Sequence, residues 1–146
     1  MGEMTAYWIR IGLAALAAGA ACASIAGCGL DMASPDLFVL HRTGQGSRLT
    51  LLVNDSGTVR CNGSKPKSLS DPLLLDARDL AKDLDGDVTD SLKFTRPAKV
   101  FTYRVQLQDG TLTFSDVAAT NRKHPELARA VLFAAQAAQG PCGLTG

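Results

Sequence analysis

Apolar and polar residues alternate along the segment from Phe101 to Phe114, and this pattern constrains the fold more than any other feature of the chain. Alternation with a period of two is typical of a strand that buries one face and exposes the other. Asp109-Gly110 interrupts the pattern with a pair that favours the tight turn of a hairpin. The apolar positions are Phe101, Tyr103, Val105, Leu107, Leu112 and Phe114. The segment therefore predicts two antiparallel strands whose apolar face is covered by another part of the chain.

Three further strands are expected upstream of this hairpin, over residues 37–43, 48–53 and 58–61. Glycines separate the first two, and Asn54-Asp55-Ser56-Gly57 makes a turn between the second pair. The segment from Asn62 to Leu69, which contains Gly63 and Pro66, is expected to be a loop.

Two helices complete the expected domain. The first begins after Ser70, a residue type suited to capping a helix, and ends at Gly86. The second runs from Pro125 to Gly140. Both carry apolar residues at helical spacing: Leu73, Ala77, Leu80, Ala81 and Leu84 in the first, and Leu127, Val131, Ala134 and Ala138 in the second. The order of three strands, a helix, two strands and a helix predicts an α+β fold, in which two helices cover one face of an antiparallel sheet of about five strands.

The N-terminal thirty residues are expected to be an export and anchoring segment. No charge occurs from Ile11 to Leu30, and Arg10 precedes this run, as in an export signal. Ile25-Ala26-Gly27-Cys28 resembles the lipobox of bacterial lipoproteins. That resemblance implies a signal peptide over residues 1–27, a lipid-modified Cys28, and an anchor and linker over residues 28–36. The length and patterning of the remaining residues, 37–146, predict a single domain.

Other interpretations of this segment stay open. Twenty uncharged residues can just span a bilayer of about 30 Å as an uncleaved helix. Ala21-Cys22-Ala23 could instead direct cleavage and release. Translation could start at Met1 or at Met4. All three interpretations of the apolar run, lipid anchor, uncleaved helix and release, place the domain outside the cytoplasm.

The four cysteines fit the lipoprotein interpretation. Cleavage before Cys28 removes Cys22 and leaves Cys28 as a thioether, so that Cys61 and Cys142 remain as a pair. A disulfide between them is expected in an oxidising compartment, and two separate buried thiols are the alternative.

The charge balance excludes several partners. The chain has 15 Lys and Arg against 14 Asp and Glu, a net charge of +1. No nucleic acid is expected as a partner, because binding to phosphates needs clustered basic residues. The chain contains no Cys-x-x-Cys pair of the kind that indicates a zinc site, and no cofactor is expected.

No residues are identified as catalytic or metal-ligating, and the chain is not expected to be an enzyme. His41 lies in a predicted strand and His124 precedes Pro125, and neither belongs to a recognisable nucleophile–base motif. The run from Asp83 to Asp90 resembles a calcium loop in its alternate aspartates. It has Val88 where an EF-hand needs glycine and Phe94 where it needs glutamate. A solvated loop is therefore favoured over ion binding.

Two surfaces could bind a protein partner. One is the polar face of the sheet, made by Arg60, Thr102, Arg104, Gln106, Thr111 and Thr113. The other is a second apolar face of the last helix, made by Leu132, Phe133 and Ala135, which would otherwise be packed deeply in the domain.

Two family resemblances bear on function. The hairpin from Phe101 to Thr111, with Phe114-Ser115-Asp116 and the helix at Pro125-Glu126-Leu127, looks like the second half of emfourin-type inhibitors of thermolysin-like metalloproteases. The whole chain looks like small lipoproteins of high-GC Gram-positive bacteria. The sequence thus predicts a lipoprotein anchored through Cys28 at the extracytoplasmic face of the plasma membrane, with a small non-catalytic binding domain. A cell-surface inhibitor of a metalloprotease is the alternative.

Overall fold

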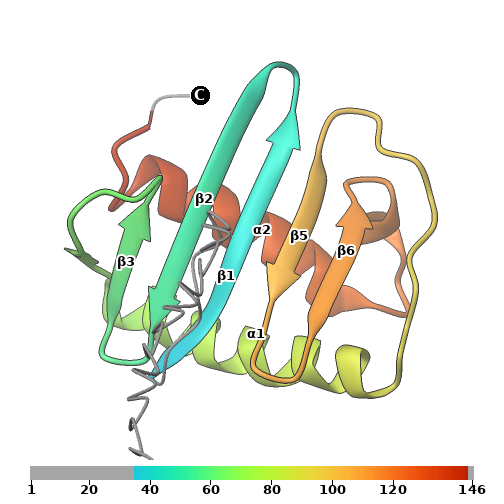
Figure 1. Ribbon diagram of the computed structural model, residues 1–146, viewed down its shortest axis with the longest axis horizontal. Helices are drawn as coiled ribbons and strands as arrows, with labels where there is room; N and C mark the ends of the chain where they lie inside the picture. The colour runs from blue at the N-terminus through green and yellow to red at the C-terminus, as the bar shows by residue number, and fades with distance from the viewer. Residues whose placement is uncertain (1–34, 145–146) are drawn as a thin grey trace, which may run out of the picture.

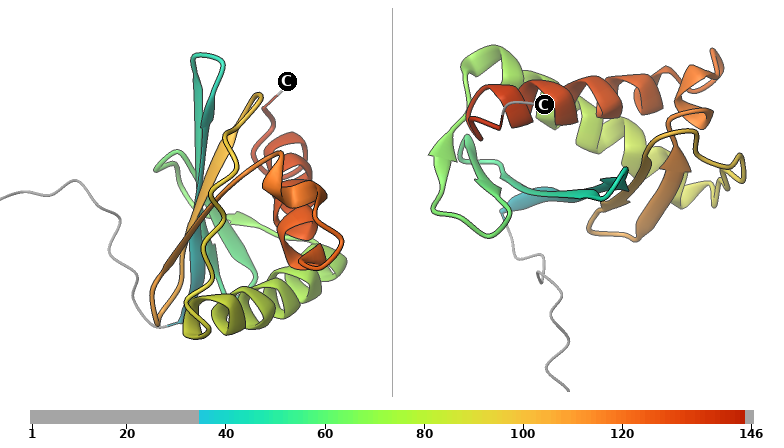
Figure 2. Two further views of the ribbon diagram at one scale, coloured as in Figure 1. Left: turned by 90° about the vertical axis from the view of Figure 1, so that its right-hand side faces the viewer. Right: turned by 90° about the horizontal axis from the view of Figure 1, so that it is seen from above.

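The computed structural model describes residues 35–144, which form one open antiparallel sheet with two helices on one of its faces (Figures 1 and 2). The chain runs through β1 (Asp36–Gly44), β2 (Ser47–Asn54), β3 (Thr58–Cys61), β4 (Lys67–Ser68), α1 (Asp71–Thr89), β5 (Thr102–Gln106), β6 (Thr111–Ser115), η1 (Ala118–Thr120) and α2 (Pro125–Gln139). The expected α+β class, antiparallel sheet and one-sided helical layer are confirmed.

The sheet has six strands in the order β4-β3-β2-β1-β5-β6, where about five were expected. The additional strand, β4, lies in the segment that was expected to be a loop. It contributes two residue pairs to β3, Thr58 with Ser68 and Val59 with Lys67. Two residues are too few to show alternation, which is why this strand has no signature in the sequence.

Helix α1 extends to Thr89, so the prediction that it ends at Gly86 was wrong. Glycine weakens a helix interior by about 1 kcal/mol relative to alanine but does not stop it. The helix is ended by backbone bonds from Asp90 to Gly86 and from Ser91 to Val88, and Ser91 adopts a left-handed φ of 56°. The run from Asp83 is therefore helical up to Thr89 and is not a loop.

The core lies between the inner face of the sheet and the two helices. Its largest fully buried side chains include Phe38, Leu40, Leu51, Leu80, Phe114, Leu127 and Phe133. The rings of Phe38 and Phe133 meet edge to face with centroids 5.5 Å apart, which joins the central strand to α2. Four alanines of α2 are buried, so this helix packs close to its neighbours. The described residues thus enclose a continuous core of their own.

Neither helix of the described residues is long and apolar enough to cross a membrane.

Candidate functional site

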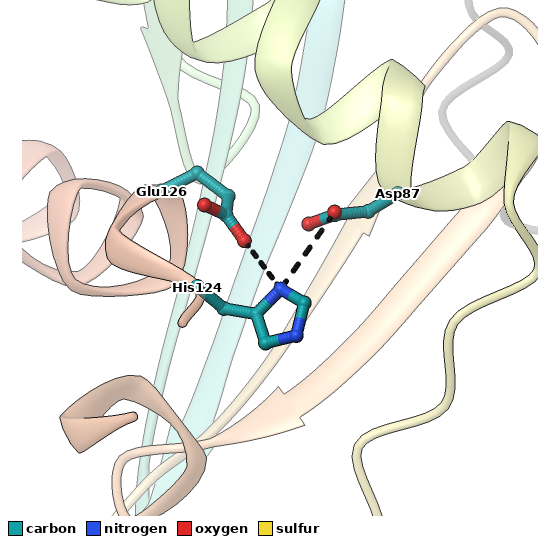
Figure 3. A group of neighbouring side chains, drawn as sticks. All are labelled: Asp87, His124 and Glu126. Atoms are coloured by element: carbon teal, nitrogen blue, oxygen red, sulfur yellow. Dashed lines mark hydrogen bonds and ion pairs between the residues drawn. The ribbon is translucent and has the colours of Figure 1, made fainter. Parts of the chain in front are cut away.

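Three potential ligand groups meet where the last turns of α1 approach the start of α2 (Figure 3). They belong to Asp87, near the end of α1, to His124, the N-cap residue of α2, and to Glu126, in its first turn. His124 Nδ1 lies 3.0 Å from Glu126 Oε1 and 3.9 Å from Asp87 Oδ1. One nitrogen and one oxygen from each carboxylate all lie within 4.8 Å of one another. We call these three residues the junction cluster.

The two carboxylates of the junction cluster are largely withdrawn from solvent. The side chains of Asp87 and Glu126 are each 12% exposed, and that of His124 is 25% exposed. Burial raises the pKa of Asp87 to about 6, assisted by the adjacent carboxylate of Glu126. The positive charge of His124 opposes this rise in pKa. Asp87 Oδ2 is enclosed and has no hydrogen-bond partner among the described residues.

The surroundings hold the imidazole of the junction cluster in place. The ring of Phe94 meets the ring of His124 edge to face, with centroids 4.9 Å apart. Phe94 follows α1, so that the segment after this helix packs against the beginning of α2. His124 thereby presents Nδ1 to both carboxylates (Figure 3).

No metal ligands were predicted from the sequence, and this grouping of residues was not foreseen. The acidic run was expected to be a solvated loop, but most of it lies in α1, so that its carboxylates point in different directions. Asp83 faces Arg129 of α2, at 2.6 Å, whereas Asp87 faces His124. His124 was noted in the sequence only as the residue before Pro125, outside any nucleophile–base motif. Only the packing of the two helices brings Asp87 to that pair.

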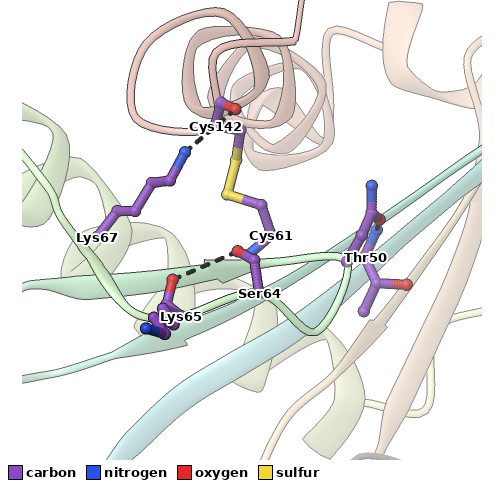
Figure 4. Close-up of a disulfide and its surroundings, with 7 residues drawn as sticks. Thr50, Cys61, Ser64, Lys65, Lys67 and Cys142 are labelled. Carbon is purple, nitrogen blue, oxygen red and sulfur yellow. Dashed lines mark hydrogen bonds between the residues drawn. A yellow bond between two sulfur atoms is a disulfide. The ribbon is translucent and has the colours of Figure 1, made fainter.

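Cys61 and Cys142 form the disulfide that was predicted (Figure 4). Their α-carbons are 5.8 Å apart, and the two residues are separated by 81 positions in the chain. Lys67 Nζ donates to the carbonyl oxygen of Cys142 at 3.4 Å, next to the bond. The disulfide ties the end of β3 to the turn after α2. Cys28 lies outside the described residues.

The face of the sheet opposite the helices, the outer sheet face, is mainly polar and basic, with the apolar Val39 and Leu52 in its middle. Across the strands, Thr50 stands beside His41, His41 beside Arg104, and Arg104 beside Thr113. The exposed arginines of this face are Arg48, Arg60 and Arg104. His41 Nδ1 lies 3.0 Å from Thr50 Oγ1. Burial and the charges of Arg104 and Arg48 lower the pKa of His41, so this imidazole is mainly neutral at pH 7.

The last helix uses most of its apolar residues inside the domain. Phe133 is fully buried, and of the large apolar residues of α2 only Leu132 is strongly exposed, at 53%. Of the two alternatives, deep packing in the domain therefore holds for this helix, which shows no wide second apolar face.

A shallow groove lies at the opposite end of the helix pair from the junction cluster. It has a volume of about 700 Å³ and runs between the start of α1 and the end of α2. Its walls include Leu73, Asp76, Gln136 and Pro141. This groove brings together no histidine and no pair of carboxylates, so it lacks the potential ligand groups that meet in the junction cluster.

Comparison of the chain with models of known protein families, with curated proteins and with solved structures finds no match.

Proposed function

We propose that this chain is a lipid-anchored extracytoplasmic protein whose domain binds a partner and does not catalyse a reaction. The observation that carries the proposal is the disulfide between Cys61 and Cys142. Disulfides persist in oxidising compartments and are rare in a reducing cytoplasm. The lipobox-like Ile25-Ala26-Gly27-Cys28 supports attachment at the membrane, since two acyl chains suffice for stable anchoring.

The outer sheet face is the surface that we propose binds the partner. Its exposed charges are the arginines Arg48, Arg60 and Arg104, and hydroxyl groups of Thr50, Thr111 and Thr113 lie among them. Arginine favours interfaces because its planar group forms paired hydrogen bonds with carboxylates. In contrast, α1 on the other side of the domain carries Asp71, Asp76, Asp79, Asp83, Asp85 and Asp87. Charge complementarity therefore points to a carboxylate-rich protein surface as the partner of the sheet.

Cys28→Ala tests the anchor. We expect the variant to lose labelling by palmitate and to accumulate as an uncleaved or mislocalised precursor, because the thiol that receives the lipid is gone. Cys22→Ala serves as the matched control and keeps both labelling and maturation. A Cys28→Ala chain that is labelled and matures normally would refute the anchor.

Photocrosslinking in living cells, with a photoreactive amino acid incorporated into the protein, tests the binding surface. At Thr113 of the outer sheet face it should give a defined protein adduct, and Arg104→Glu should abolish that adduct. At Leu75, which is 59% exposed on α1, the same group should give none. Equal adducts from both positions, or none from Thr113, would contradict a partner at the sheet.

A further inference from the structure

We propose that the junction cluster is a binding site for a divalent transition-metal ion of the zinc class, held by His124 Nδ1 and one carboxylate oxygen from each of Asp87 and Glu126. One imidazole and two carboxylates form a ligand set that zinc accepts, with a fourth position left for water. The imidazole favours zinc and its neighbours in the periodic table over magnesium and calcium, which prefer oxygen ligands.

The distances fit such a site with small side-chain movements. Zinc lies about 2.0 to 2.2 Å from nitrogen and oxygen ligands, so that two donors of a tetrahedral site are about 3.4 Å apart. The distances of 3.0 Å and 3.9 Å from His124 Nδ1 to the two carboxylates lie on either side of that value. All three donors fall within 4.8 Å of one another. The ion would have access from solvent past His124, whose side chain is 25% exposed.

The electrostatics of the junction favour a cation there. Asp87 and Glu126 hold two carboxylates close together at low exposure, and Asp90 adds a third negative charge nearby. Within residues 35–144, His124 is the only basic group that forms an ion pair with either member of this carboxylate pair. The negative end of the α1 dipole lies at the same place, and the last turn of α1 carries no basic residue.

An independent observation comes from Asp87 itself. Its Oδ2 atom is enclosed without a hydrogen-bond partner in the described part of the chain. Buried oxygens of native proteins are nearly always satisfied, and an orphan of this kind is often explained by a missing ion or water. A metal that takes Oδ2 as its Asp87 ligand would satisfy this atom.

Calorimetric titration of the full chain with Zn²⁺ tests the proposal. The protein is purified in detergent without a histidine tag and stripped with a chelator. It is then alkylated, so that any unprocessed chain with free thiols at Cys22 and Cys28 cannot bind metal through them. We expect one Zn²⁺ per chain with a dissociation constant of about 10 μM or lower, because three protein ligands of this type make established zinc sites. The Tm of the protein should rise when Zn²⁺ is added, and it should rise much less with Ca²⁺ or Mg²⁺ at the same concentration.

Variants of the junction cluster assign the binding to these residues. Asp87→Asn and His124→Gln should each weaken Zn²⁺ binding by at least the roughly 10- to 100-fold that loss of an outer-shell partner already causes. Without metal, Asp87→Asn should unfold at the same temperature as the wild type or higher, because it removes a poorly solvated charge beside Glu126. Asp79→Asn is the matched control, since it makes the same change at an exposed position of α1 and should leave binding within threefold.

Two results would overturn the site. One is the absence of any heat or thermal shift with Zn²⁺ up to millimolar concentration. The other is Zn²⁺ binding that stays within threefold of wild type in both Asp87→Asn and His124→Gln, which would place the ion elsewhere on the protein. Circular dichroism without metal checks that each variant is folded, and Glu126→Gln replaces either variant that is not.

Discussion

The disulfide between Cys61 and Cys142 should supply a large share of the stability of this domain. It joins β3 to the turn after α2 across 81 positions of the chain. The enclosed segment contains both helices and half of the sheet, so that reducing the bond frees the unfolded chain over most of the domain. We consider the double variant Cys61→Ala/Cys142→Ala, which removes the bond and leaves no free thiol at either position.

The expected loss follows from the length of the closed loop. The chain-entropy treatment gives about 4.5 kcal/mol for a loop of about eighty residues, and measured native disulfides of small domains contribute roughly 2 to 5 kcal/mol. We therefore expect a loss of about 3 to 4.5 kcal/mol in the free energy of unfolding. For a domain of about 110 residues this corresponds to a fall in Tm of roughly 12 to 18 °C.

Urea unfolding followed by far-ultraviolet circular dichroism measures the loss. Tryptophan fluorescence is unsuitable because the only tryptophan is Trp8, outside the described residues. Wild-type protein with its disulfide reduced is the control, since it loses the bond and keeps both sulfur atoms in their buried positions. A loss below about 1 kcal/mol in the double variant and in the reduced protein would refute the chain-entropy reasoning.

Three further results are expected. Burial alone would raise the pKa of Asp116, but hydrogen bonds from the backbone N–H groups of Lys99, Phe101 and Val100 hold the pKa below its ordinary value. The contribution of Asp116 to the free energy of unfolding should therefore be complete above about pH 4 and should be lost as the pH falls through the pKa of Asp116 in the folded protein. An Asp116→Asn variant with the same acid dependence of urea unfolding as the wild type would contradict this. Phe133→Ala should cost about 3 to 5 kcal/mol because the ring is fully buried against Phe38, whereas Leu132→Ala, one residue away and 53% exposed, should cost less than about 1 kcal/mol; equal losses in urea unfolding would show that the packing of α2 is wrong. The acidic run Asp83–Asp90 should not bind calcium tightly, because the helix directs its carboxylates to different sides, and a calorimetric dissociation constant for Ca²⁺ in the micromolar range would disprove that expectation.

The strands could be predicted because a period of two maps directly onto the two faces of a sheet. Tyr103, Val105, Leu112 and Phe114 are buried as their alternation requires. Phe101 departs from the pattern, since it is only partly buried and carries the guanidinium of Arg42 over its ring, 4.8 Å from the centroid. Edge positions of this kind depend on what the neighbouring strand places beside them.

Helix α2 shows where the sequence is insufficient. Its apolar residues extend nearly around the helix, so that their spacing does not settle which side faces the core. Val131 was expected in the core stripe and is only partly buried, whereas Phe133, which was assigned to a second apolar face outside that stripe, is fully buried. The side that turns inward is marked by the edge-to-face contact of Phe133 with Phe38 and by the buried alanines of α2.

The junction cluster could not be predicted for a related reason. Glu126 and His124 are neighbours in the sequence, but Asp87 reaches them only because α1 runs on past Gly86 and ends beside the start of α2. Had the helix ended at Gly86, as the glycine suggested, Asp87 would have had no fixed direction.

The strand order has a consequence for how the chain is assembled during synthesis. The first strand to leave the ribosome, β1, lies in the middle of the sheet between β2 and β5, and β5 follows only after the whole of α1. Phe133, the partner of Phe38 in that strand, is synthesised later still, near the end of the chain. A nascent chain can therefore pair β1, β2 and β3 early, but it cannot close its core until nearly the last residue has been added. Such late closure leaves the apolar face of the early hairpins without its helical cover until synthesis is nearly complete.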